Sequence, residues 1–110
     1  MAGDPVPALV WCPFPDEEAA LAAIHQLLDE RLIACGNVLG PMTCVFVWNG
    51  QKDAGRESGA LLKTNSDLLD AAVNRLAEIH SYEEPAVVGW RCDAAAAGTA
   101  GWLAAIAGNT

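Results

Sequence analysis

The chain has 110 residues, of which 53% are hydrophobic and 18% charged, and its net charge is −8. This length fits one domain with an ordinary core, so we expect a single domain over residues 1–110. Phosphate binding relies on clustered Lys and Arg, so six scattered basic residues argue against nucleic acid as a partner, and an anionic membrane would repel the chain. The hydrophobic share is more than a small monomer readily hides, which predicts an oligomer.

Signals for export or membrane insertion are not evident in the sequence. No apolar run approaches the roughly 20 residues that a bilayer-spanning helix requires. Residues 1–4 lack the basic region of a signal peptide. We therefore expect a cytoplasmic protein without a membrane partner.

The four cysteines, Cys12, Cys35, Cys44 and Cys92, are widely spaced and form no Cys-x-x-Cys pair. This spacing excludes zinc-ribbon and thioredoxin sites. In a reducing compartment we expect free thiols. For Cys44 and Cys92, which lie in strand-like runs, we expect small buried side chains.

The first half of the chain predicts a strand, a helix and a second strand. The apolar run Val6–Cys12 is typical of a strand covered on both faces. Pro15-Asp16 and the acidic residues that follow form a helix start, and helical spacing of apolar residues predicts a helix over Glu17–Ile33. Met42–Trp48 alternates with strand period and ends at Asn49-Gly50, a strong turn signal.

The second half repeats this pattern. Glu57–Thr64 is predicted as the returning strand of the hairpin, with the polar segment Gln51–Arg56 as its loop. Ser66-Asp67 is predicted to cap a second helix that ends near His80. Ala86–Cys92 is predicted as the fourth strand. In the tail, Thr99 is predicted to cap a short helix that Gly108 stops.

This order of elements is typical of an α+β, ferredoxin-like split βαβ fold (βαββαβ plus a C-terminal helix), with two helices on one face of a four-stranded antiparallel sheet. Something else must then cover the other face. We expect the long second strand, with which the hairpin begins, at a sheet edge, where an apolar strand needs a partner from another subunit. The pattern therefore predicts symmetric assembly through sheet edges, with Trp48 contacting a neighbour.

The segment His80–Pro85 crowds an imidazole, a phenol and two carboxylates into six residues. Tyr82 is the only tyrosine, and Pro85 ends any preceding helix. We expect any metal or small-ligand site at this corner between the second helix and the fourth strand.

Five motifs resemble, in the right order, those of the CutA family of divalent-cation tolerance proteins. They are Pro15–Glu17, Glu30–Asn37, Phe46–Gly50, Lys63-Thr64 and His80–Pro85. The resemblance covers almost the whole chain and implies a small trimeric ferredoxin-like protein. The chain departs from the family signature at the corner itself, where Ser81 replaces a proline and Ala86 a glutamate.

The resemblance also implies a metal site. It implicates Cys12, Cys35 and His80 as ligands, and Glu83 matches the family glutamate at the corner. Thiolate and imidazole are ligands that copper prefers, so copper or another divalent cation is the expected cofactor. A shared ion requires these residues to converge, within a subunit or across an interface.

Each of these residues also has a structural interpretation. Cys35 fits a buried thiol at the helix exit equally well. For His80 the alternative is a C-terminal helix cap, where a cation meets the helix dipole. For Glu83 it is an ion pair with Arg31 or Lys63. We interpret the second histidine, His25, as a surface or partly buried residue.

Catalytic motifs are missing from the sequence. It contains no nucleophile elbow, phosphate loop, metal-hydrolase histidine pair or nucleotide fingerprint, so we do not expect an enzyme. The leading interpretation is a cytoplasmic homotrimer that binds copper or another divalent cation and contributes to metal tolerance. The alternative is a trimeric signalling or scaffold protein that binds a small effector in intersubunit clefts, without metal.

Overall fold

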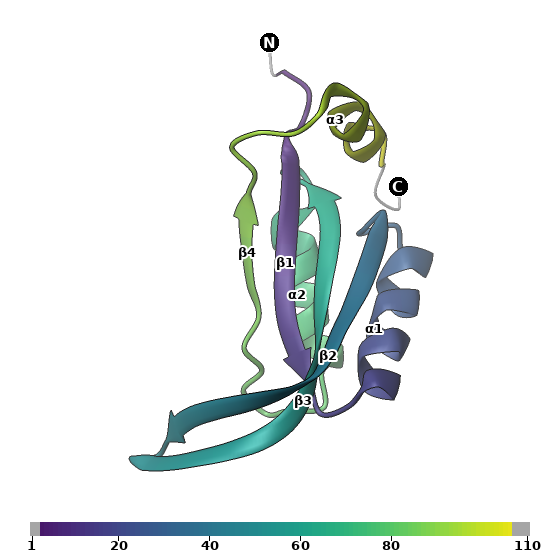
Figure 1. The fold of residues 1–110 in the computed structure, drawn as a ribbon. Coiled ribbons are helices and arrows are strands. Elements are labelled where there is room, and N and C mark those ends of the chain that lie inside the picture. The colour runs from purple at the N-terminus through teal and green to yellow at the C-terminus, as the bar shows by residue number, and fades with distance from the viewer. Residues whose placement is uncertain (1–2, 107–110) are drawn as a thin grey trace.

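The computed structural model describes residues 3–106. Four antiparallel strands form one sheet in the order β2-β3-β1-β4, and α1 and α2 lie behind it (Figure 1). The α+β, split βαβ prediction is therefore confirmed. In chain order the elements are β1 (Pro7–Phe14), α1 (Glu17–Asp29), β2 (Cys35–Trp48), β3 (Gln51–Asn65), α2 (Leu69–Ile79), β4 (Val88–Arg91) and α3 (Ala97–Ala104).

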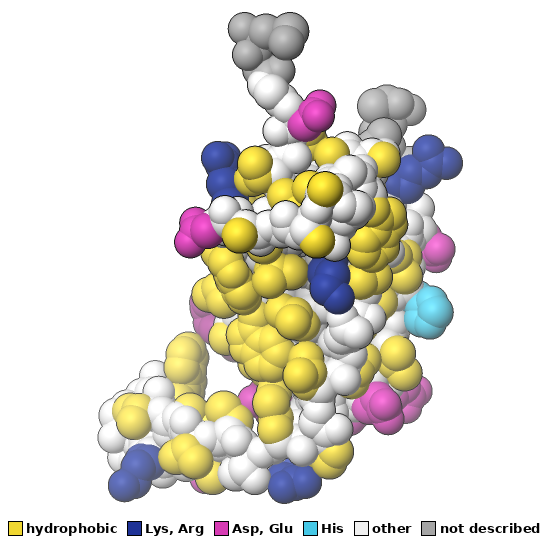
Figure 2. Space-filling model, turned by 45° about the horizontal axis from the view of Figure 1, so that its top comes forward, with side chains coloured by type: hydrophobic (Ala, Val, Ile, Leu, Met, Phe, Trp, Pro, Cys, Tyr) yellow, Lys and Arg dark blue, Asp and Glu magenta, His cyan; other side chains and the backbone are white. Residues whose placement is uncertain are grey.

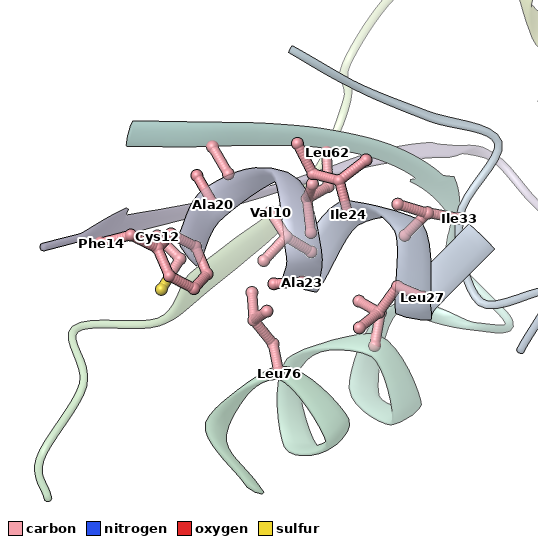
Figure 3. Close-up of a cluster of buried hydrophobic side chains, with 12 residues drawn as sticks. Val10, Cys12, Phe14, Ala20, Ala23, Ile24, Leu27, Ile33, Leu62 and Leu76 are labelled. Carbon is pink, nitrogen blue, oxygen red and sulfur yellow. The ribbon is translucent and has the colours of Figure 1, made fainter. Parts of the chain in front are cut away.

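The core lies between the sheet and the two helices. Successive side chains of a strand point to opposite faces, and every second side chain of β1, such as Val10 and Phe14, is buried. These side chains pack with Ile24 and Leu27 of α1 and Leu76 of α2 (Figure 3). The apolar spacing predicts the buried stripe of α2 correctly. In α1, Leu21 and Leu28 of the predicted stripe are 42% and 36% exposed, and Leu27 is buried instead.

In the described residues 3–106, neither α1 nor α2 covers the opposite face of the sheet, and α3 contacts β1 and β3 near Asn65, at one end of the strands. The prediction that the first strand is covered on both faces is therefore wrong for a single chain. Trp11 of β1, its partner Val88 of β4 and Trp90 lie on this face. Val88 is 55% exposed and Trp90 is 44% exposed. Hydrophobic side chains gather on this side of the molecule (Figure 2). A large apolar face open to water is an interaction surface.

The first helix ends earlier than predicted. It stops at Asp29 and not at Ile33, because Arg31 adopts a left-handed conformation with φ of 59°. The backbone N–H groups of Arg31 and Leu32 then bond to the last helical carbonyl groups of α1. Asp16 caps the start as predicted, its side chain accepting a hydrogen bond from the N–H of Ala19 at 2.8 Å.

The hairpin is much longer than predicted. Residues 51–56 are not a loop but the first part of β3, paired with the end of β2. The turn prediction is confirmed, since Asn49 and Gly50 both have positive φ. We call the projecting segment Met42–Glu57 the hairpin arm (Figure 1). Its returning half is polar, so the hydrophobic alternation disappears although the ladder continues.

A β-bulge separates the hairpin arm from the rest of the sheet. In the ladder between β2 and β3, Leu39 pairs with Gly59 and Met42 pairs with Glu57. One more residue therefore lies on β2 than on β3 between these pairs. Gly40, within the bulge, has a φ of 125°, a region that favours glycine.

The sheet edges are β2 and β4. The expected edge position of the second strand is confirmed for β2, whereas residues 59–63 of β3 pair with both β1 and β2. Only the part of β3 in the hairpin arm pairs with β2 alone.

Asn65, a buried residue at the end of β3, fixes both later helices. Its Oδ1 accepts hydrogen bonds from the N–H groups of Asp67 at 3.0 Å and Leu68 at 3.2 Å. Its Nδ2 donates to the carbonyl oxygen of Leu103 at 2.8 Å. The predicted Ser66-Asp67 cap is therefore wrong, because Asn65 supplies the side-chain oxygen.

The last two elements differ from prediction at their ends. β4 covers only Val88–Arg91, and α3 begins at Ala97, so Thr99 lies inside that helix and does not cap it. The predicted stop at Gly108 lies outside the described residues. Within residues 3–106 none of the helices has the length and apolar character needed to cross a bilayer.

Candidate functional site at the base of the hairpin arm

His80, directly after α2, is a buried side chain with both ring nitrogens hydrogen-bonded. The residue is 8% exposed and its ring stacks on Phe14 with a centroid distance of 4.4 Å. Its Nε2 lies 2.8 Å from the carbonyl oxygen of Pro13, and its Nδ1 lies 3.0 Å from the backbone nitrogen of Tyr82.

These partners determine the tautomer of His80. A carbonyl oxygen can only accept and a backbone N–H can only donate, so Nε2 donates and Nδ1 accepts. No ring lone pair is left for a metal in this arrangement. His80 is the C-cap residue of α2, in line with the alternative interpretation, but its ring links the corner to β1 as a neutral imidazole.

Cys12 lies close to His80 but is enclosed in the core. Its thiol donates to the carbonyl oxygen of Pro13 at 3.5 Å, the same oxygen that His80 bonds. Burial, followed by the negative charge of Glu57, raises the pKa of the Cys12 thiol to about 12. Because the thiolate is the metal-binding form, Cys12 is a poor ligand in this state.

Cys35 lies on the other face of the sheet. It pairs with Lys63 of β3, which in turn pairs with Leu9 of β1. Directly paired residues share a face and neighbours along a strand alternate, so Cys35 faces the uncovered side while Cys12 faces the core. Within one chain these two thiols do not converge. Cys35 is half-buried, not enclosed.

Glu83 is exposed at the corner and makes no ion pair with Arg31 or Lys63; Lys63 instead donates to Asn37 at 3.1 Å. His25 is exposed, as predicted. Among residues 3–106 of one chain, no three His, Cys, Asp or Glu side chains gather as a metal site would need. A metal site at Cys12, Cys35, His80 and Glu83 therefore stays a prediction.

A cleft of about 640 Å³ lies between the hairpin arm and the corner that follows α2. From the arm, Cys44, Phe46 and Trp48 line it. From the corner, Tyr82 and Glu83 line it. The expectation that functional groups gather at the corner thus leads to a concave site, and its other wall comes from the hairpin arm.

Glu57 is the centre of the hydrogen bonding in this cleft. Its Oε2 accepts from the hydroxyl of Tyr82 at 3.0 Å, and its carboxylate also accepts from the thiol of Cys44. The hydrogen bond to Glu57, followed by burial, raises the pKa of Cys44. For Tyr82, burial and then the hydrogen bond to Glu57 raise the pKa to about 12. Both groups therefore stay protonated at neutral pH.

Sequence reasoning missed the roles of Glu57 and Cys44. Cys44 was expected to be buried, and so was Cys92, but both are only half-buried. The signal available for Cys44 was its alternation with Phe46 and Trp48, which places the three side chains on one face. Glu57 gave no signal, because its partners lie 13 and 25 residues away in the chain.

The sequence of this chain is similar to those of known proteins. The family model described as CutA1 divalent ion tolerance protein matches residues 8–105. This chain belongs to the CutA1 family. A divalent-cation tolerance protein CutA from Pyrococcus horikoshii is 40% identical over 80 residues, covering 73% of this chain and 78% of that protein. A CutA from Thermotoga maritima is 35% identical over 79 residues, covering 72% and 77%.

Solved CutA1 structures have the same fold. The crystal structure of divalent ion tolerance protein CutA1 from Ehrlichia chaffeensis matches with a TM-score of 0.86 and 30% identity, covering 92% of this chain and 94% of that chain. CutA1 from Pyrococcus horikoshii matches with a TM-score of 0.81 and 34% identity, covering 87% and 93%. The resemblance that the five motifs indicated is confirmed.

Proposed function

We propose that this CutA1 protein is a cytoplasmic homotrimer that binds copper or another divalent cation, contributes to metal tolerance by that binding, and is not an enzyme. The family match over residues 8–105 is the observation that carries the proposal. The relatives named above are divalent-cation tolerance proteins.

The open face of the sheet supports an oligomer. Val88, Trp90 and Leu39 each leave more than two fifths of their surface exposed there. β2 and β4 also present unpaired edges, which a neighbouring chain can extend. Self-association would remove both the apolar face and the edges from water.

The placement of the donors supports ligands from more than one subunit. Cys12 and His80 are tied to the carbonyl oxygen of Pro13, whereas Cys35 faces the uncovered side and Glu83 is exposed. No three metal-binding side chains of the described residues gather within one chain. A site with three or more such ligands therefore needs a second subunit.

Two measurements test this function. Light scattering should give a mass of about 34.5 kDa, three times the 11.5 kDa chain. Titration of the reduced protein with Cu(I) and Cu(II) should show binding that weakens at least tenfold in Cys35→Ser and Glu83→Gln, with Cys92→Ser as the control. A monomeric mass would contradict the assembly, and copper binding equal in all variants would contradict the ligands.

The alternative, a trimeric signalling or scaffold protein with a small effector, is favoured by one observation. The cleft at the base of the hairpin arm has a volume in the range of small-molecule sites, about 300–1,000 Å³. A bare metal ion does not need so large a cleft.

A further inference from the structure

The cleft at the base of the hairpin arm has an aromatic wall. Phe46 and Trp48 alternate along β2, so both side chains lie on the same face of the arm as Cys44. In the single chain Trp48 is 57% exposed, so much of its ring is uncovered by its own subunit. Tyr82 lines the cleft from the corner. Three aromatic rings thus border one concave surface.

The charges at the cleft are predominantly negative. Glu57, Glu83 and Glu84 all line it. Glu57 accepts from Tyr82 and Cys44, which hold their protons, so neither neutralises its charge. Glu83 and Glu84 are exposed and make no ion pair with any described residue. Their carboxylates are free to meet a ligand.

The one basic residue at the cleft points elsewhere. Arg56 pairs with Thr43 in the ladder and donates to the hydroxyl of Thr43 at 3.2 Å. Side chains alternate between faces, so this pair lies on the opposite face of the arm from Phe46 and Trp48. The guanidinium of Arg56 therefore belongs to the reverse face, and the charged groups left to face an anionic ligand in the cleft are the carboxylates of Glu57, Glu83 and Glu84.

A metal ion also fits the cleft poorly, because its acidic and thiol groups do not form a set of three within reach of one ion. An ammonium group binds through other interactions than a metal ion does. It is attracted to the face of an aromatic ring and to nearby carboxylates, and it tolerates longer distances than a coordinated metal. The rings and free carboxylates of this cleft offer both partners.

We propose that the cleft binds a small organic cation, an ammonium group on a flat apolar body, with the apolar part against Phe46 and Trp48 and the charge near Glu83 and Glu84. This site goes beyond the proposed metal binding and shares only Glu83 with it, so Glu84 and Trp48 distinguish the two. It gives the trimer an effector-binding surface whose two walls come from the hairpin arm and the corner after α2.

The test uses three probes of one shape, benzylammonium, benzyl alcohol and benzoate, added to the full chain. Binding is followed by NMR shifts of the tryptophan indole N–H groups, assigned with a Trp48→Phe variant. We expect benzylammonium to bind at millimolar concentration and to shift the Trp48 signal. The alcohol should bind about five- to tenfold more weakly, since it lacks the charge, and benzoate should not bind.

Matched variants distinguish binding in the cleft from attraction of the cation to the overall negative charge of the protein. Glu83→Gln with Glu84→Gln should weaken benzylammonium binding about five- to tenfold. Asp29→Asn with Asp67→Asn removes the same charge outside the cleft lining and should change binding less than twofold. Trp48→Leu should weaken binding by a similar five- to tenfold factor, because it removes the largest aromatic surface.

Three results would overturn the proposal. These are equal binding of the alcohol and the ammonium probe, equal loss in the two paired carboxylate variants, and the absence of any shift at Trp48. Copper titration of Glu84→Gln and Trp48→Leu keeps the two proposals apart, since these variants should bind copper as the parent protein does. Failure of the cation site would leave the metal result unchanged, and the reverse also holds.

Discussion

The body of the subunit and the hairpin arm use the same alternating strand pattern for different purposes. In the body, alternate residues of β1 enter a core closed by α1 and α2 (Figure 3). On the arm, Val45 and Val47 stay 68% exposed on one face, and Phe46 and Trp48, which line the cleft together with Val47, lie on the other. The body buries its own apolar side chains, whereas the arm leaves apolar side chains exposed, where another molecule can bind.

The largest expected effect is in the body. Leu27→Ala removes a fully buried side chain and should lower the free energy of unfolding by about 2–5 kcal/mol, through lost burial and a cavity. Urea unfolding at fixed protein concentration measures this. Val47→Ala on the arm is the matched control and should cost less than about 0.5 kcal/mol if the arm is free. A larger loss that depends on protein concentration would show that the arm contacts a neighbour.

The next effect concerns the link between the two regions. His80→Ala leaves the Pro13 carbonyl and the Tyr82 N–H without their ring partners and removes the stack on Phe14. The free energy of unfolding should fall by about 2–3 kcal/mol. The exposed His25→Ala should change it by less than about 0.5 kcal/mol. Equal effects of the two substitutions would mean that His80 does not support the corner.

The smallest effect is on titration in the cleft. Tyr82 is the only tyrosine, so the ultraviolet absorbance of phenolate reports it alone, with an expected pKa of about 12. A pKa raised in the folded state means that Tyr82 adds stability below about pH 10, its unfolded value, and that this is lost as pH rises through about 12.

A second substitution separates the two causes of that shift. Glu57→Gln should lower the pKa of Tyr82 only in part, because burial is the larger cause and Glu57 the smaller. The same substitution should lower the pKa of Cys44 and speed its alkylation by iodoacetamide. An unchanged Tyr82 pKa would mean that the bond to Glu57 does not persist in solution.

The same contrast explains what the sequence could predict. Regular apolar spacing around Ile24 and Leu76 predicted the two helices and the split βαβ order, because burial requires such spacing, although it chose Leu28 and not Leu27 for the buried face of α1. The returning half of the hairpin arm has no such spacing, and it was mistaken for a loop. Asn65 was overlooked as a cap because its partners come from α2 and α3, which only the folded chain brings together.

The sequence indicated where the candidate site lies but not which residues form it. The corner from His80 to Pro85 does border a cleft, as its residue types indicated. The role of His80 depended on a carbonyl 67 residues away in sequence, which no local pattern reveals. Register likewise sets Cys44 opposite Gly55, two residues from Glu57, and only strand pairing could show that.

The bulge between Leu39 and Met42 determines which side chains lie on each face of the hairpin arm. Before the bulge, the odd-numbered side chains of β2 share a face with the odd-numbered side chains of β3. After it, the even-numbered side chains of β2 do, because the single extra residue shifts the alternation by one. A chain one residue shorter at this point would place Val45 and Val47 on the face that Phe46 and Trp48 now occupy, and both aromatic rings on the reverse face. Insertions and deletions at this short segment could therefore exchange an aromatic binding wall for an aliphatic one while the subunit body stays unchanged.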